Sequence, residues 1–185
     1  MRGRKKAKML DFVIVGGAQA GLSMAYHLKK MGKSFLIVDA EKEIGASWLN
    51  RWNSLKLFTP TEYNHLPGFP FEATKQQYPD KYEVADYFKK YVAKFDFPIQ
   101  LETLITSVKK TENGFQLKHE NGQIEAKNVI VATGPFHTPF TPPCHQNISK
   151  SVVQMHSNYY KELGQLQNGD ALVVGAGDSG YQLLD

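Results

Sequence analysis

Two short apolar runs near the start of the chain flank a segment with helical spacing. Residues 12–15 (FVIV) and 35–38 (FLIV) are continuous and rich in β-branched side chains, which is typical of buried parallel strands. Between them, apolar residues recur at Ala20, Met24, Leu28 and Met31. Gly32 follows and is suited to ending a helix. The pattern predicts a strand, a helix and a second strand that ends at Asp39.

The middle of the chain lacks this regularity. Periodicity fails from Gly45 to Tyr78, a stretch that holds two tryptophans and three prolines, and so long an irregular segment is often functional. Asp80 and Glu83 then have the spacing of a capping box. The helix predicted after them has an apolar face formed by Val84, Phe88, Tyr91, Val92 and Phe95.

Short strand signals fill the region after Pro98. The apolar runs predict strands at 104–108, 115–119, 123–126, 129–132 and 171–174. The second and third of these form a hairpin around Asn121-Gly122, a strong two-residue turn signal. Strands that alternate with helices predict an α/β fold with a parallel sheet, here carrying a β-hairpin or meander insert.

Composition and charge narrow the function classes. Apolar residues make up 42% and charged residues 22% of the chain, as in ordinary globular proteins. No run of about 18 uncharged apolar residues occurs, so we expect no membrane span. The formal net charge of +4 depends on five cations among the first eight residues, without which it is −1. Such a tail could contact nucleic acid or an anionic membrane, but we favour a solvated tail and expect neither partner.

Cysteine usage and the start of the chain bear on its location. Cys144 is the single cysteine, which excludes an internal disulfide and a CxxC redox pair. Asp11 interrupts the apolar run after the basic tail, which argues against a secretory signal. We therefore expect a reducing, cytoplasmic setting.

A glycine-rich loop directly follows the first predicted strand. Residues 16–21 read GGAQAG and open the predicted helix. A diphosphate needs close backbone approach and free N–H groups, which a helix N-terminus supplies together with its dipole. Ala18 departs from the G-x-G-x-x-G pattern at its middle glycine, and Asp39 stands where a carboxylate can accept hydrogen bonds from a ribose. With strand, helix, strand and acidic residue in register, the loop predicts a dinucleotide site.

A second glycine loop lies near the end of the chain. Residues 175–180 read GAGDSG, keep all three glycines and follow the predicted strand at 171–174. This loop looks like a nicotinamide-dinucleotide site. Little sequence follows it, so we expect the loop alone to bind a nicotinamide cofactor weakly, and we expect the strand before it to fold back on the first unit, to pair in a dimer or to be disordered.

The chain resembles the class B flavin-dependent monooxygenases, and among them the bacterial flavin-containing monooxygenase-like oxidoreductases. The segments that carry the resemblance are GGAQAGLS at 16–23, GASWLNRWNSLKLFTP at 45–60, YPDKYEVADY at 78–87, VIVATGPF at 129–136, HSNYY at 156–160 and VVGAGDSG at 173–180. The resemblance implies a Rossmann-like FAD/NAD(P)-binding fold. It divides the chain into a basic tail at 1–9, an FAD-binding domain at 10–145 and the start of an NAD(P)-binding domain at 146–185.

The resemblance also implies which residues contact the cofactors, with Trp48 and Arg51 along the flavin and the Ile105 backbone at the adenine. The implied residues are Gly16, Gly17, Ala18, Gln19, Ala20, Gly21, Asp39, Ala40, Ser47, Trp48, Arg51, Ile105, Ala132, Thr133, Gly134, His156, Gly175, Gly177, Ser179 and Gly180. Neither the residues nor the resemblance identify a catalytic side chain or a metal ligand.

For activity, the resemblance implies that NADPH reduces FAD and that a flavin C4a-hydroperoxide oxygenates a soft nitrogen, sulfur or carbonyl substrate. His156 and Tyr160 match the end of the family signature F-x-G-x-x-x-H-x-x-x-Y, but Lys150 and Val152 replace its phenylalanine and glycine. Pro60 stands where many members carry asparagine. Two alternatives therefore stay open: a flavin-dependent NAD(P)H reductase without oxygenation, and a catalytically inactive FAD-binding fragment. The expected partner is a small-molecule substrate, and a homodimer is one option.

Overall fold

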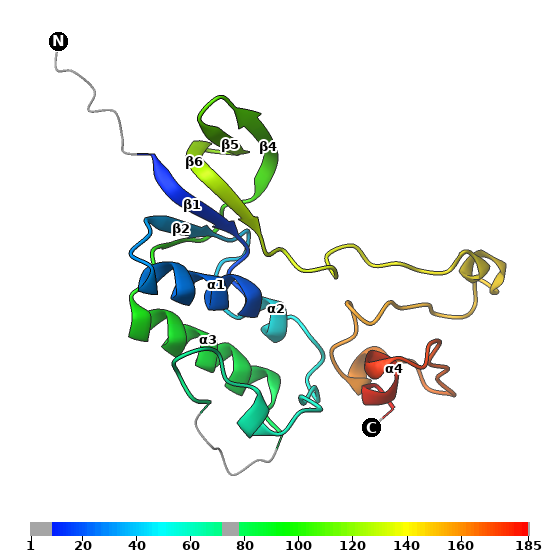
Figure 1. Ribbon diagram of the computed structural model, residues 1–185. Helices are drawn as coiled ribbons and strands as arrows, with labels where there is room; N and C mark the ends of the chain where they lie inside the picture. Colours follow the sequence, from blue (N-terminus) through cyan, green and yellow to red (C-terminus); the bar gives the residue numbers. More distant parts are fainter. Residues whose placement is uncertain (1–8, 72–77, 185) are drawn as a thin grey trace.

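A mixed six-stranded sheet organises the chain in the computed structural model, which describes residues 9–71 and 78–184 (Figure 1). The strands are β1 (Leu10–Val15), β2 (Phe35–Val38), β3 (Ile99–Gln100), β4 (Ile105–Thr111), β5 (Gly114–His119) and β6 (Gly122–Val131). Their order is β3-β2-β1-β6-β5-β4, with parallel pairing from β3 to β6 and antiparallel pairing from β6 to β4. The predicted α/β class with a parallel sheet and a meander is confirmed. The predicted basic tail lies outside the described residues apart from Met9.

Helix α1 (Gln19–Lys30) connects β1 to β2 and buries one side against the sheet. Leu22, Ala25 and Leu28 form this buried side, whereas Met24 is 39% and Met31 66% exposed. The apolar spacing in the sequence therefore identified the helix but only part of its buried face. Beyond the helix end, Gly32 adopts φ +64°, a left-handed conformation that glycine enters without a Cβ clash.

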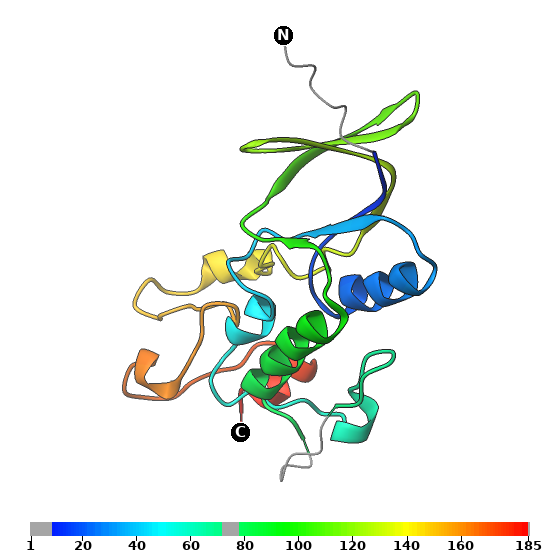
Figure 2. The ribbon, with the colours of Figure 1, turned by 90° about the vertical axis from the view of Figure 1, so that its left-hand side faces the viewer.

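Helix α3 (Lys81–Phe95) lies beside α1 on the same side of the sheet, as Figures 1 and 2 show from two directions. The predicted capping box is confirmed: an Asp80 oxygen accepts hydrogen bonds from the Tyr82 and Glu83 N–H groups at 2.8 and 2.9 Å, and Glu83 accepts one from the Asp80 N–H at 3.0 Å. The first hydrophobic core joins the sheet, α1 and α3; its fully buried members are Ile14, Leu22, Ala25, Ile37 and Tyr91.

The opposite side of the sheet is covered by the meander of β4, β5 and β6 (Figure 2). Val13 and Val38 from the parallel strands meet Leu117 and Ala126 from the meander in a second buried cluster. The separate strands predicted at 123–126 and 129–132 are one continuous strand, β6, whose first part pairs with β5 and whose length from Ala126 onward pairs with β1. The polar residues Lys127 and Asn128 separate its two apolar runs, so the sequence indicated two strands.

The hairpin prediction is off by one residue. His119 pairs with Gly122, so the two connecting residues are Glu120 and Asn121 rather than Asn121 and Gly122. The strand predicted at 104–108 also begins one residue later and extends to Thr111. Gly122 has φ +150°, which explains why glycine suits the first paired position after the turn.

In the long segment before α3, the described residues form only the short helix α2 (Ala46–Leu49) and a 3-10 turn, η1 (Thr61–Tyr63). Tyrosines of α3 hold this segment in place. The Tyr87 hydroxyl donates to the Phe69 carbonyl at 2.6 Å and accepts from the Leu66 N–H at 2.7 Å, and the Tyr91 hydroxyl donates to the Pro67 carbonyl at 2.7 Å. Hydrogen bonds from a regular helix thus give an irregular chain a defined path.

The chain beyond β6 runs away from the sheet and returns beside α2, as the yellow-to-red part of Figure 1 shows. Up to residue 184, it holds only η2 (Pro143–Asn147), η3 (Leu163–Gln165) and α4 (Asp178–Gln182). The strand predicted at 171–174 is wrong: this segment pairs with no strand among the described residues, and Leu172 is 87% exposed. Its β-branched composition favours an extended backbone, but a strand also needs a neighbour that completes its hydrogen bonds.

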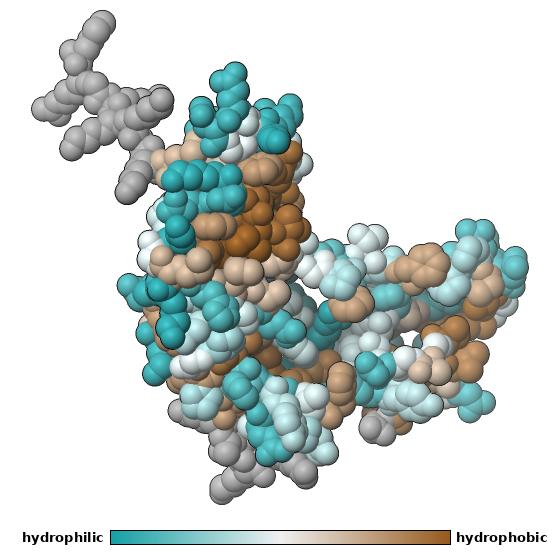
Figure 3. Space-filling view, in the orientation of Figure 1, coloured by the Kyte–Doolittle hydropathy of each residue, from teal (hydrophilic) through white to brown (hydrophobic). Residues whose placement is uncertain are grey.

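Apolar side chains also gather on the surface, over the antiparallel strands on the side that faces this returning segment (Figure 3). Leu104, Val108 and Val131 are 62%, 45% and 74% exposed. Among the helices of residues 9–71 and 78–184, none is long and apolar enough to cross a membrane.

Asp11 ties three strands together at the end of the sheet where β1 begins. Its carboxylate accepts hydrogen bonds from the Ser34 N–H at 3.0 Å and hydroxyl at 2.8 Å, and from Lys127 Nζ at 2.7 Å. The hydrogen bond from Lys127, followed by those from Ser34, holds the pKa of the Asp11 carboxyl well below its usual range.

We expect Asp11→Asn to lower the urea midpoint of unfolding near pH 7, because the charge-assisted hydrogen bonds from Lys127 and Ser34 are lost. A depressed folded-state pKa contributes stability above the unfolded value of about 3.9 and loses it as pH falls, so the difference from wild type should shrink below about pH 4. Asp86→Asn is the control, because Asp86 forms an exposed pair with Lys90 at 3.0 Å and should change little. Equal effects of the two substitutions at pH 7 would contradict the role given to Asp11.

Candidate functional site

The first glycine loop brings three backbone segments into direct contact at the end of β1. Gly16 has φ +113°, and a Cβ built on it would lie 2.3 Å from the Ala132 carbonyl oxygen. A Cβ on Gly21 would lie 1.9 Å from the Gly16 carbonyl oxygen. Both distances are far below van der Waals contact, so neither position accepts a side chain without movement of the backbone. The loop therefore has the close turn that the sequence predicted.

The start of α1 presents backbone N–H groups that no side chain caps. Ala18 is the N-cap, with extended backbone angles, and the first turn holds no acidic residue. The first hydrogen bond inside the helix runs from the Leu22 N–H to the Ala18 carbonyl at 2.9 Å. The N–H groups of Gln19, Ala20 and Gly21 come before it and have no acceptor within the helix. Free amides at a positive helix end form an anion-binding site. Ala18 adopts φ −92°, so the alanine at the middle glycine position is under no backbone strain.

Asp39 lies next to this turn, as predicted. One of its carboxylate oxygens accepts the Gly17 N–H at 2.5 Å, and the other accepts the Glu41 N–H at 2.9 Å. These bonds fix the carboxylate at the end of β2 while each oxygen keeps a further lone pair for a ligand hydroxyl. Ala40 follows it at the surface.

The residues at the end of β6 lie against the first glycine loop. Ala132 N–H donates to the Val15 carbonyl at 2.8 Å, which brings Ala132 and Thr133 against Gly16. Gly134 has φ +74° and nothing within 4 Å of a built Cβ, so it lies in open space. Ile105, at the start of β4, packs into the second core cluster and pairs with His119. The structure thus brings the first loop, Asp39 and residues 132–133 together, and the contact implied between Ile105 and an adenine stays a prediction.

The second glycine loop repeats the geometry of the first. Gly175 has φ +121°, and a Cβ on Gly180 would lie 2.0 Å from the Gly175 carbonyl oxygen. The N-cap Gly177 has extended backbone angles, and its carbonyl accepts the Tyr181 N–H at 3.2 Å. Ser179 lies in the short helix α4 that follows. The loop retains the dinucleotide-type turn although no strand in the described part of the chain pairs with the segment before it.

Trp48 reaches the site from the short helix α2. It is half-buried against the first core cluster, while Ser47 beside it is exposed. Gly45 begins this helix with φ +88°, and a Cβ there would lie 2.7 Å from the Cα and Cβ of Ala85 in α3. The glycine therefore allows α2 to touch α3. Trp52 is buried at 2% exposure, and its indole N–H has no hydrogen-bond partner among the described residues.

A buried lysine holds the segment after Trp48. Lys81 is 2% exposed, and its ammonium donates to the carbonyls of Leu49 and Arg51 at 3.2 and 2.7 Å and to the Asn53 side-chain oxygen at 3.0 Å. Burial lowers the pKa of Lys81, and the Asp80 carboxylate opposes that shift. Three acceptors match the three donors of the ammonium, so the charge is compensated by dipoles rather than by a carboxylate.

The same segment also contacts the returning part of the chain. Lys161 donates to the Asn50 carbonyl, and the Asn53 N–H donates to the Lys161 carbonyl at 2.7 Å. Arg51 donates to the Asn158 side-chain oxygen at 3.2 Å. Burial lowers the pKa of Lys161, and the nearby charges of Lys81 and Arg51 lower it further. The implied cofactor residue Arg51 is therefore directed at residues 156–162.

His156 lies at the start of this contact, with its ring nitrogen Nδ1 accepting the Asn158 N–H at 3.1 Å. The structure brings His156 near Arg51 through Asn158, but it gives His156 no contact with the first glycine loop. Among residues 9–71 and 78–184, no group of three His, Cys, Asp or Glu side chains could hold a metal ion.

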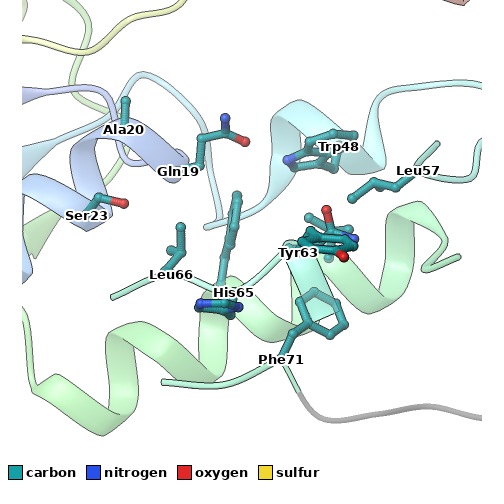
Figure 4. A pocket seen from close by; sticks show the side chains of 12 residues that line it. Gln19, Ala20, Ser23, Trp48, Leu57, Tyr63, His65, Leu66 and Phe71 are labelled. Carbon is teal, nitrogen blue, oxygen red and sulfur yellow. The ribbon is translucent and has the colours of Figure 1, made fainter. Parts of the chain in front are cut away.

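An open pocket of about 310 Å³ lies between the start of α1, α3 and the segment from Leu57 to Phe71 (Figure 4). Gln19, Ala20 and Trp48, all predicted as cofactor residues, line it. The sequence interpretation missed its other lining residues and Lys81. A signal was present for Lys81, since it shares the helical spacing of Val84 and Phe88, and a lysine on a buried helix face is unusual. No local signal distinguished Ser23 or His65.

Comparison with known proteins identifies the family. The family model described as "Pyridine nucleotide-disulphide oxidoreductase" matches residues 13–183. The uncharacterized oxidoreductase CzcO of Bacillus subtilis is 45% identical over 175 residues, which cover 95% of this chain and 51% of that protein. The probable indole-3-pyruvate monooxygenase YUCCA3 of Arabidopsis thaliana is 30% identical over 92% of this chain and 42% of its own length. The chain spans about half the length of the curated relatives it matches.

A solved structure agrees with these sequence relatives. A flavin monooxygenase from Stenotrophomonas maltophilia superposes with a TM-score of 0.89 at 32% identity, over 95% of this chain and 54% of that one. The match to the family model extends from β1 to beyond the second glycine loop, so it includes both loops on which the dinucleotide prediction depends. The chain therefore belongs to the pyridine nucleotide-disulphide oxidoreductase family and is similar to its flavin monooxygenases.

Proposed function

We propose that the chain binds FAD at the first glycine loop and forms the flavin-binding part of an NADPH-dependent oxidoreductase of the monooxygenase type. The observation that carries the proposal is the turn at residues 16–21, where α1 begins with uncapped amides and the backbone packs too closely at Gly16 and Gly21 to admit a side chain. Similarity to flavin monooxygenases supports FAD as the dinucleotide.

The residues present fit such a cofactor. Gly16 and Gly21 provide the close backbone approach that a diphosphate needs, and the free N–H groups of Gln19, Ala20 and Gly21 would hold its charge. Asp39 is oriented by the Gly17 and Glu41 N–H groups, and its remaining lone pairs suit the hydroxyls of a ribose. A phosphate on that ribose would meet a carboxylate, which favours an unphosphorylated nucleotide at this loop.

The remaining predicted residues receive roles within this proposal. Thr133 and Gly134, beside Gly16, would line the approach to the diphosphate, and Trp48 would exclude water from one side of the flavin. When bound, the flavin supplies hydride acceptance and the activation of oxygen. We propose residues 10–145 as the FAD-binding unit and 146–185 as the start of the unit for the nicotinamide cofactor, in which Gly175, Gly177, Ser179 and Gly180 would hold its diphosphate.

Oxygenation of a soft nitrogen, sulfur or carbonyl substrate is the activity we favour, because monooxygenases recur among the similar proteins. A reductase without oxygenation is the second candidate, and one observation favours it. Pro60 supplies no side-chain amide beside the site, and the amide of Asn64 is bonded to the Thr59 and Pro60 carbonyls at 2.8 and 3.0 Å. That amide is therefore committed to holding the loop.

FAD retention after desalting tests whether the first glycine loop binds FAD. We expect the wild-type chain to hold FAD with a flavin absorption spectrum, and Gly21→Ala to bind at least about tenfold more weakly, because its Cβ meets the Gly16 carbonyl. Gly180→Ala is the matched control, since it introduces the same clash in the second loop and should leave FAD binding unchanged. Loss of FAD in both variants, or in neither, would contradict the assignment to the first loop, provided circular dichroism shows both folded.

Reduction by NADPH separates the candidate activities. We expect anaerobic NADPH to bleach the flavin absorption and air to restore it, with formation of a sulfoxide from an added thioether. Bleaching with NADPH consumption but no oxygenated product would support the reductase. A flavin that stays oxidised in excess NADPH would leave only the FAD-binding unit and contradict both enzyme activities.

Replacement of Lys81 tests how the segment around Trp48 is held. We expect Lys81→Met to lower the free energy of unfolding by about 2–4 kcal/mol, because it leaves the Leu49 and Arg51 carbonyls and the Asn53 side-chain oxygen without their donor. Lys89→Met, which removes an exposed pair with Glu43, should cost less than about 1 kcal/mol. Similar urea midpoints for the two variants would show that the buried ammonium does not stabilise this segment.

A further inference from the structure

We propose that the pocket between α1, α3 and the segment from Leu57 to Phe71 binds a neutral, ring-bearing small molecule, the organic substrate of the flavin site. This inference rests on the proposed function, because it takes the first glycine loop as the cofactor site.

The pocket is large enough for one small ring system and is formed by elements far apart in sequence. Its volume of about 310 Å³ lies at the lower end of the range for small-molecule sites. Figure 4 shows Gln19, Ala20 and Ser23 on α1 facing it from one side, with Trp48 and Tyr63 on the other. Val84 and Phe88 of α3 complete the lining.

The irregular wall of the pocket is held by hydrogen bonds from α3. Leu66 lines the pocket, and its N–H donates to the Tyr87 hydroxyl at 2.7 Å. The Tyr91 hydroxyl bonds the Pro67 carbonyl, and the Phe71 ring stacks on Tyr87 with centroids 4.5 Å apart. Because both tyrosine hydroxyls belong to a 15-residue helix, this wall keeps its shape before any ligand binds.

The lining favours a neutral aromatic molecule. Aromatic rings stand on several sides, at Trp48, Tyr63, Phe71 and Phe88, and suit stacked or edge-to-face contacts with another ring. Among the described residues that line the pocket, none is Asp, Glu, Lys or Arg. An ion in this open pocket would find no counter-charge among the described lining residues, whereas a neutral ring would bury apolar surface against the aromatic side chains.

The pocket also offers unused neutral hydrogen-bonding groups. Among the described residues, the Gln19 amide and the Ser23 hydroxyl have no hydrogen-bond partner. His65 Nδ1 lies 2.9 Å from the Glu62 carbonyl, which only accepts, so Nδ1 carries the hydrogen and Nε2 keeps a free lone pair. These groups could orient one polar substituent of an otherwise apolar ligand.

Position links the pocket to the cofactor loop. Gln19 and Ala20 belong both to the uncapped first turn of α1 and to the pocket lining. A molecule in the pocket therefore lies next to whatever the turn binds. A substrate of the flavin must occupy such a place, close to the cofactor yet outside the amide-lined turn.

Equilibrium dialysis with thioanisole, a neutral ring that carries a soft sulfur, tests the inference on the FAD-loaded chain. We expect Ser23→Leu, which fills the pocket from α1, to weaken thioanisole binding at least about tenfold while FAD content stays at the wild-type level. Met24→Leu is the matched control on the same helix, because Met24 does not line the pocket, and it should bind like wild type. The anion 4-(methylthio)benzoate should bind at least about tenfold more weakly than thioanisole to the wild-type chain.

The other outcomes overturn the inference in distinguishable ways. If Ser23→Leu loses FAD together with thioanisole, the pocket belongs to the flavin ring, and the proposed function stands while the substrate assignment fails. Unchanged thioanisole binding in Ser23→Leu, or equal binding of the anion, would place the ligand elsewhere or contradict the neutral class. If the wild-type chain binds no FAD, the proposed function fails, and dialysis of the cofactor-free chain with the same variants still shows whether the pocket takes the ring.

Discussion

Contact between backbone segments at Gly16 and Gly21 is the constraint on which the site depends. Three strands and a helix end converge there, and carbonyl oxygens occupy the positions where side chains would begin. The absence of two Cβ atoms lets α1 start directly at the end of β1, and no side chain caps its first amides. The helix dipole then adds a favourable potential for an anion at the same point. An anion site thus arises from backbone geometry, with Asp39 as its one charged side chain.

Helix α3 holds the irregular segments near that turn in place. Its first residue, Lys81, donates hydrogen bonds to carbonyls at the end of α2 and just after it. Further along the helix, Tyr87 and Tyr91 donate to carbonyls of the segment from Leu66 to Phe69. Both sets of bonds satisfy polar groups that an irregular segment leaves without partners. A buried ammonium surrounded by neutral acceptors needs all of them, because loss of any one acceptor leaves part of the desolvated charge without a hydrogen bond. The pocket and the position of Trp48 are therefore consequences of one helix.

Sequence patterns predicted the parts of the molecule that are governed by local rules. The glycine spacing, the strand–helix–strand order and the Asp80 capping box were all correct, since each depends on a few neighbouring residues. The pocket and the Lys81 contacts were not predictable, because both depend on tertiary structure. The Lys81 contacts join residues about 30 positions apart, and the pocket joins residues between Gln19 and Phe88. Residues 171–174 show the opposite error: a local preference for strand was present, but no neighbouring strand satisfied it.

The continuous course of β6 carries a further consequence. Ala126 pairs with Leu10 in β1 and with Phe115 in β5 at once, so the meander and the parallel sheet share one register. A slip of the hairpin by a single residue would move every later residue of β6 by about 3.3 Å and reverse the face on which its side chains lie. The same shift would reach the end of the strand and displace Ala132 from its position against Gly16. The length of the turn at residues 120–121, more than ten residues before Ala132, therefore helps to determine the geometry of the nucleotide site.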